Sequence, residues 1–139
     1  MRLWIVTYLA TALGFLGCDA VWLSLMASRL YRPALGGLLR DAFALAPAIA
    51  FYVIYIAGIL IFAVAPARAT GDWYGATRRG ALLGLMAYAT YDLTNQATLR
   101  DWPLAITLAD LCWGTALTAL AATIGFIVAR WAGGSASTG

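Results

Sequence analysis

Long apolar segments separated by short polar links dominate this chain. Four of the segments are long enough to cross a bilayer, which takes about 20 residues. They run over residues 3–28, 43–65, 75–98 and 104–128. The pattern predicts an all-α integral membrane protein, an antiparallel bundle of four transmembrane helices. We expect one domain over residues 1–131 and a flexible tail over 132–139.

The first apolar segment allows a second interpretation. The stretch LGFLGC, followed by Asp19, is similar to a bacterial lipoprotein cleavage site, in which Cys18 would carry the lipid. The apolar region of a signal has about 7–15 residues and is then removed. Here the apolar run continues through AVWLSLMA to spanning length, so we expect an uncleaved first helix.

The composition excludes several classes of site. The chain is 63% hydrophobic and 11% charged, and its basic residues are all Arg and its acidic residues all Asp. Without Lys there is no amine for a Schiff base. Without His and Glu, the usual haem, zinc and di-iron sites and His-containing catalytic triads are excluded. Cys18 and Cys112 lack metal-type spacing, so we expect them to be small buried hydrophobic residues, and we expect no metal and no cofactor.

The arginines are scattered among the ends of the apolar segments. They are typical of interface anchors and not of a nucleic-acid surface, which needs a concentrated basic face. Five lie on the side of the termini and four on the other side. The positive-inside rule then predicts cytoplasmic termini. The first set is Arg2, Arg68, Arg78, Arg79 and Arg130, and the second is Arg29, Arg32, Arg40 and Arg100.

Small residues recur at four-residue spacing in the third and fourth segments. They form the GxxxG pair Gly80 and Gly84 and the stripe Gly114, Thr118 and Ala122. Small residues let helix backbones approach closely where water cannot drive association. The pattern predicts a compact bundle.

Three aspartates, Asp19, Asp92 and Asp110, lie inside the apolar segments. Asp19 is about nine residues, or ~14 Å, from the end of its segment, and the other two are about six residues, ~9 Å, from theirs. Because those three helix ends belong to one side, the carboxylates should share one layer below a single face. Each costs at least ~2.5–3.5 kcal/mol at mid-helix depth. We therefore expect them to face the interior and to be paired, protonated or hydrated.

Aromatic and polar residues extend this layer. Asp19 and Asp110 each begin a D-x-x-W unit, so a tryptophan lies one turn along on the same face. The two units indicate an inverted repeat or a chance match. Residues 88, 92 and 95 share one stripe of the third helix. The predicted ligand-binding residues are Asp19, Trp22, Tyr88, Asp92, Asn95, Asp110 and Trp113, below a head-group rim of Arg29, Arg32, Arg40 and Arg100.

The alternative is a purely structural role, in which these polar groups only hold the helices together through interhelical hydrogen bonds, at an average of ~0.6 kcal/mol per contact. Three carboxylates at one depth favour a functional pocket over this structural role. The first hypothesis is binding or transport of a small cationic or lipid-like ligand, through charge and cation–π attraction. The second is a membrane enzyme for a lipid-like substrate, with Asp92 or Asp110 as general acid or base and the rim holding a phosphate. The third is an accessory subunit of a larger membrane complex or homo-oligomer, docked through the GxxxG surface.

Three segments carry a resemblance to a known family: D-x-x-W-L from Asp19, YATYDLTNQATLRDWP from Tyr88, and D-x-x-W-G from Asp110. Together they resemble the small bacterial membrane proteins of domain of unknown function 2177, over about residues 3–128. The resemblance implies a four-helix protein of the bacterial cytoplasmic membrane. It implies no reaction, ligand or cofactor.

Overall fold

The computed structural model describes residues 1–40, 42 and 44–134. Within this part of the chain the structure is helical and contains no strand, which confirms the predicted all-α class. Two of the four rods are interrupted by π-helical turns, at Ala27–Tyr31 and Leu60–Val64, where the helix takes more residues per turn. The helices are α1 (Arg2–Met26), α2 (Arg32–Leu35), α3 (Leu45–Ile59), α4 (Ala65–Thr70), α5 (Trp73–Thr98) and α6 (Leu104–Gly134), with a 3-10 turn at Gly36–Leu38.

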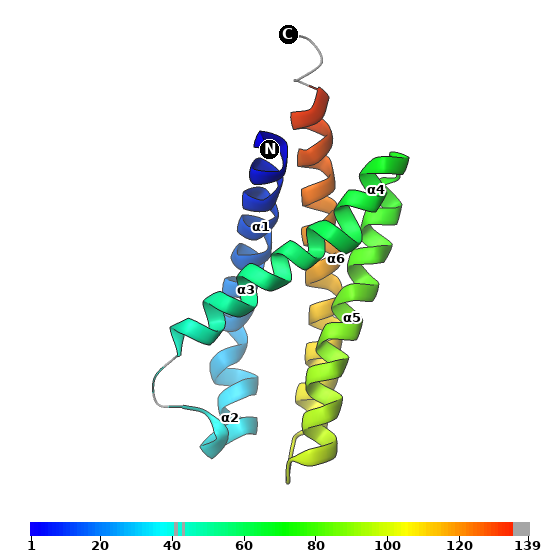
Figure 1. The fold of residues 1–139 in the computed structure, drawn as a ribbon. Helices are drawn as coiled ribbons and strands as arrows, with labels where there is room; N and C mark the ends of the chain where they lie inside the picture. Colours follow the sequence, from blue (N-terminus) through cyan, green and yellow to red (C-terminus); the bar gives the residue numbers. More distant parts are fainter. Residues whose placement is uncertain (41, 43, 135–139) are drawn as a thin grey trace.

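Three of the four rods are long and apolar enough to cross a membrane. They are the continuous helical stretches Arg2–Leu38, Leu45–Thr70 and Leu104–Gly134. The fourth rod, α5, has 26 residues and is long enough. It is more polar than the others because it carries Arg78, Arg79 and Asp92. It runs beside α6 in the opposite direction and so completes the bundle (Figure 1).

The four rods run antiparallel, as the sequence predicts. The end of α1, the end of α5 and the start of α6 all lie at the lower end of the molecule in Figure 1. This is the side on which the depth calculation puts the three aspartates. The rod formed by α3 and α4 crosses α1 and α6 obliquely, so it is close to α5 only near its upper end (Figure 1).

Three predicted boundaries need correction. The first segment is predicted to end near residue 28, but its rod remains helical to Leu38. The second segment remains helical up to Thr70, and the turn to α5 is made by Gly71 and Asp72. Gly71 has a φ of 70°, in the left-handed region that glycine adopts without a steric penalty. The last helix, α6, continues to Gly134 and includes the first residues of the predicted tail. The rest of that tail, 135–139, lies outside the described residues.

The closest packing is between α5 and α6. A Cβ added at Gly80 would lie 2.6 Å from the Cβ of Ala122, and one added at Gly84 would lie 2.3 Å from the carbonyl oxygen of Gly114. The small-residue stripes therefore face each other, which agrees with the compact bundle that they predict. This also corrects the accessory-subunit hypothesis: Gly80 and Gly84 are buried within the chain, so they cannot form its docking face.

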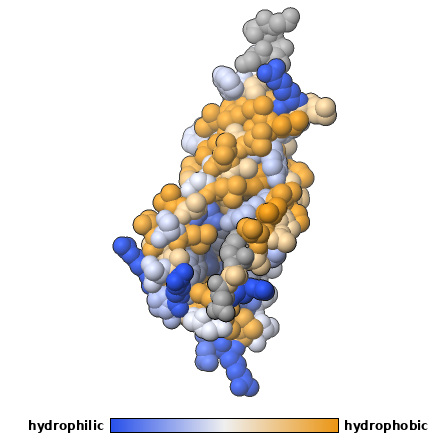
Figure 2. Space-filling model, turned by 90° about the vertical axis from the view of Figure 1, so that its left-hand side faces the viewer, coloured by the Kyte–Doolittle hydropathy of each residue, from blue (hydrophilic) through white to orange (hydrophobic). Residues whose placement is uncertain are grey.

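A second apolar core joins α1, the α3–α4 rod and α6. It contains Phe15, Ile59, Val64 and Leu117, each no more than 1% exposed. The outer surface is apolar as well. Figure 2 shows hydrophobic residues over most of the face on the α1 and α3 side, with hydrophilic residues gathered toward the lower end. This is the distribution that a bilayer requires.

Replacing a packed and an open glycine by alanine tests the α5–α6 contact. Gly84→Ala forces the backbones apart, and overpacking of this kind costs about 1–3 kcal/mol. Gly17→Ala is the matched control, because a Cβ there meets nothing within 4 Å. It should be neutral or stabilising by up to about 1 kcal/mol. Thermal unfolding in detergent measures both, and equal effects would contradict the packing described.

Candidate functional site

Asp19 connects three helices. It lies on α1 and is 9% exposed. Its Oδ2 accepts a hydrogen bond of 2.7 Å from the hydroxyl of Tyr52 on α3, and its Oδ1 accepts one of 3.3 Å from Nε1 of Trp113 on α6. Both donors are neutral, so the carboxylate is hydrogen-bonded but receives no positive charge from them.

Asp110, on α6, is bound in a similar way by the first rod. It is 8% exposed, and its Oδ1 accepts a hydrogen bond from the hydroxyl of Tyr31. The same hydroxyl accepts a hydrogen bond of 2.9 Å from Nε1 of Trp22. In a regular α-helix, residues nine apart point about 180° away from each other. The π-helical turn Ala27–Tyr31 changes this rotation and lets Tyr31 meet both Trp22 and Asp110.

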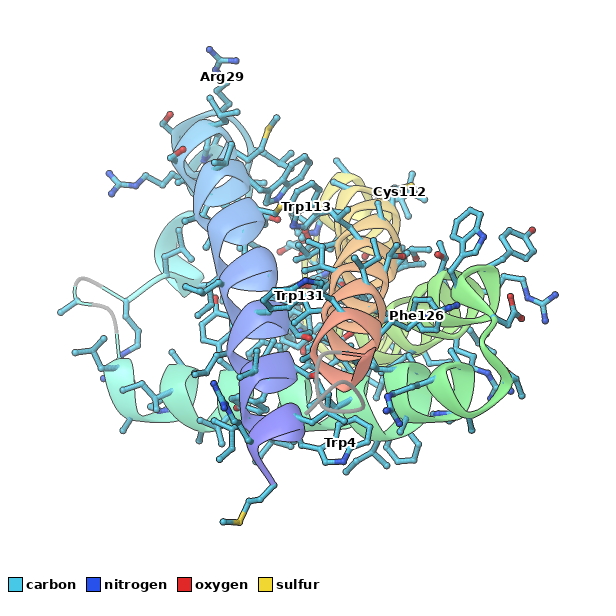
Figure 3. All side chains as sticks on the ribbon, turned by 90° about the horizontal axis from the view of Figure 1, so that it is seen from above. Trp4, Arg29, Cys112, Trp113, Phe126 and Trp131 are labelled. Atoms are coloured by element: carbon cyan, nitrogen blue, oxygen red, sulfur yellow. The ribbon has the colours of Figure 1, made fainter. Side chains whose placement is uncertain are left out.

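The two D-x-x-W units face each other across α1 and α6. The rings of Trp22 and Trp113 are stacked, with centroids 4.5 Å apart and planes 8° from parallel. In Figure 3, Trp113 points into the space between these two helices. Each tryptophan N–H is directed to the other unit: Trp113 reaches Asp19 directly, and Trp22 reaches Asp110 through Tyr31. The structure therefore brings together four of the predicted residues.

Asp92 is the least satisfied of the three carboxylates. It is fully buried, and neither oxygen has a hydrogen-bond partner among the described residues. The antiparallel register that pairs Gly80 with Ala122 and Gly84 with Gly114 and Thr118 continues to a position where Asp92 faces Asp110. Asp92 is thus near enough to Asp110, and Asp110 to Asp19, for electrostatic interaction between their carboxyl groups. A buried polar group without a partner is rare and indicates an unmet interaction.

Tyr88 occupies the space that Gly114 leaves open. A Cβ at Gly114 would lie 2.1 Å from Cδ2 of the Tyr88 ring, so only glycine admits the ring beside α6 at this depth. Asn95, the last predicted member of the α5 stripe, is half-buried, one turn beyond Asp92 and on the side of Tyr91.

A cavity of about 450 Å³ opens next to Asp110. Its walls come from three helices, with Phe51 on α3, Asp110 on α6, and Ala87, Tyr88 and Tyr91 on α5. The cavity thus combines one carboxylate with three aromatic rings. Of the predicted ligand-binding residues, Tyr88 and Asp110 line it directly.

The four rim arginines do not reach the carboxylates. Arg29, Arg32, Arg40 and Arg100 are all exposed, and Arg29 points away from the bundle in Figure 3. Among residues 1–40, 42 and 44–134, no arginine forms an ion pair with Asp19, Asp92 or Asp110. The site therefore has carboxylates but no compensating cation in the described chain.

Metal-type clusters are also absent from the part of the chain that the structure describes: no three Cys, Asp, Glu or His side chains are grouped as metal ligands would be. The two cysteines are free. Cys18 is half-buried, and Cys112 is exposed and points away from the α1–α6 contact (Figure 3). The expectation that both are buried is therefore wrong for Cys112.

Several residues of the site were missed in the sequence. They are Tyr31, Phe51, Tyr52, Ala87 and Tyr91. One signal was present for Tyr52, since a tyrosine in so apolar a run as FYVIYI needs a partner for its hydroxyl once it is buried. Tyr31 carried no such signal, because it lies in a polar link and only the π-helical turn directs it inward.

The family that matches the chain is described as "Predicted membrane protein (DUF2177)", and it covers residues 4–127. The chain belongs to this family. The matched range includes every residue of the site, and the family description confirms the membrane assignment that the resemblance implied. No curated protein and no solved structure matches the chain.

Removing one hydroxyl tests the link between the first rod and α6. Tyr31→Phe removes the hydroxyl that donates a hydrogen bond to Asp110 and accepts one from Nε1 of Trp22. Interhelical polar contacts contribute about 0.6 kcal/mol on average and up to about 1.7 kcal/mol, so a loss of about 1–3 kcal/mol is expected for the two bonds. Unfolding in detergent should show this loss for Tyr31→Phe and no change for the exposed control Tyr74→Phe. Identical stabilities would contradict the role given to Tyr31.

Proposed function

We propose that this protein binds a small organic ammonium cation inside the bilayer and serves in its binding or transport. The observation that carries the proposal is the cavity beside Asp110, in which one carboxylate is combined with the rings of Phe51, Tyr88 and Tyr91. Aromatic rings around a negative charge are the arrangement by which proteins recognise alkylated ammonium groups.

Two physical effects favour such a ligand. A cation within about 6 Å of an aromatic ring gains about 0.5–2 kcal/mol, more when both are desolvated. Charge attraction is also stronger at this depth than in water, because the surrounding dielectric constant is low. The second oxygen of Asp110 is available for this interaction, since only Oδ1 is bound by Tyr31.

The uncompensated charge supports the same ligand class. Asp110 lies near both Asp92 and Asp19, and no described arginine forms an ion pair with any of the three. Ionisable groups within a membrane usually pair with one another or mark a substrate or ion pathway. An ammonium group next to Asp110 would also give Asp92 the positive neighbour that it lacks.

The proposed setting is the bacterial cytoplasmic membrane, with both termini on the cytoplasmic side. The start of α1 and the end of α6 lie at the same end of the molecule (Figure 1), and that end carries five arginines against four at the other. The aspartate layer would then lie just below the outer face of the membrane.

Tetramethylammonium is a suitable probe. We expect saturable binding to the purified protein at constant ionic strength, followed by tryptophan fluorescence, because the stacked pair Trp22 and Trp113 lies within the site. Asp110→Asn should weaken binding at least about tenfold, which corresponds to about 1.4 kcal/mol. Asp72→Asn, an exposed aspartate at the other end of the molecule, should have no effect. Absence of saturable binding, or equal binding by both variants, would refute the proposal.

A further inference from the structure

We infer that the ligand is an amphiphile, whose ammonium group lies at Asp110 and whose hydrocarbon chain lies between α3 and α5, in contact with the bilayer. The inference rests on the proposed function and specifies its ligand further. It is carried by the direction in which the cavity opens.

The side chains that line the cavity become less exposed from its apolar opening toward the carboxyl group of Asp110. Phe51 and Tyr91, on its two sides, are 45% and 58% exposed, whereas Asp110 is 8% exposed. Asp110 lies about six residues, or ~9 Å, inside α6, so these exposed rings contact lipid and not water. The cavity therefore opens sideways into the hydrocarbon region.

The oblique course of α3 keeps this side open. Ile56 and Ile59, in the last turns of α3, are buried in the core, but Ile49, Val53 and Ile54 are each more than half exposed. The first half of α3 diverges from α5 toward the lower end of the molecule (Figure 1). The cavity between Phe51 and the α5 residues Ala87, Tyr88 and Tyr91 lies on this diverging side, and in a bilayer hydrocarbon chains would reach it.

Access from the nearer aqueous face is obstructed. One turn from Asp110 toward that face, Ile106 and Thr107 are 1% and 2% exposed. On the side of α1, the hydrogen-bonded pair Trp22 and Tyr31 covers Asp110. A ligand that enters from the membrane avoids all four side chains, and a ligand that resides in the membrane must itself be amphiphilic.

The test compares two probes with the same head group, tetramethylammonium and dodecyltrimethylammonium. The protein is held in amphipol, so that no free detergent occupies the gap. We expect the dodecyl compound to bind at least tenfold more tightly, and Ala87→Phe, which narrows the cavity, to weaken it at least fivefold. Tetramethylammonium has no hydrocarbon chain to place there, so the same substitution should weaken its binding less than it weakens binding of the dodecyl compound. Ala20→Phe is the matched control, because this alanine is exposed on α1 at similar depth and does not line the cavity.

If the Ala87→Phe variant does not fold, Ala87→Leu provides a smaller obstruction. It should weaken binding of the dodecyl compound to an intermediate degree. If both probes bind equally and no substitution at Ala87 matters, the amphiphile is refuted while the cation site remains. If neither probe binds in a manner that depends on Asp110, the proposed function fails, and this inference fails with it. Binding of the dodecyl compound that is weakened equally by Ala20→Phe would also refute the lateral opening.

Discussion

The structure depends on keeping Asp19 and Asp110 hydrogen-bonded in the apolar interior of the bundle. A buried carboxyl group needs donors within the protein, and these two find theirs on neighbouring helices, whereas Asp92 has none among the described residues. Asp19 takes its donors from Tyr52 and Trp113, so it connects α1, α3 and α6. Asp110 accepts a hydrogen bond from the hydroxyl of Tyr31, which lies in the π-helical turn. These bonds hold the lower half of the bundle together, where the first half of α3 contributes little apolar packing.

Close packing and the site have a common origin in the glycines of α5 and α6. Gly80 and Gly84 let the two backbones approach, and the same register directs Asp92 toward Asp110. Gly114 then leaves the space in which Tyr88 lies beside the carboxylate. Two carboxyl groups are thus brought near each other by contacts that involve no charge. A cationic ligand would stabilise these two carboxyl groups in their ionised form. For that reason we propose that they belong to a binding site and do not serve the fold alone.

The bilayer completes this protein in two ways. It is the solvent for the exposed apolar surface (Figure 2), and it would cover the cavity between α3 and α5. A soluble protein with Phe51, Val53 and Ile54 this exposed would bury them against a partner. In a bilayer lipid chains would serve instead, and the proposed amphiphile would enter from the same side.

The sequence by itself determined the number of helical rods and their alternating direction, because segment length is a local property. It also marked Gly80 and Gly84 as positions of close helix packing, although it did not say that their partner is α6. Only the tertiary structure decided which way each helix is rotated, how α3 crosses the bundle, and that Tyr31 and Tyr52 point inward. The physical reason is that lipid chains are as apolar as leucine. Hydropathy therefore does not mark the inner face of a membrane helix, and packing and hydrogen bonds between helices select it.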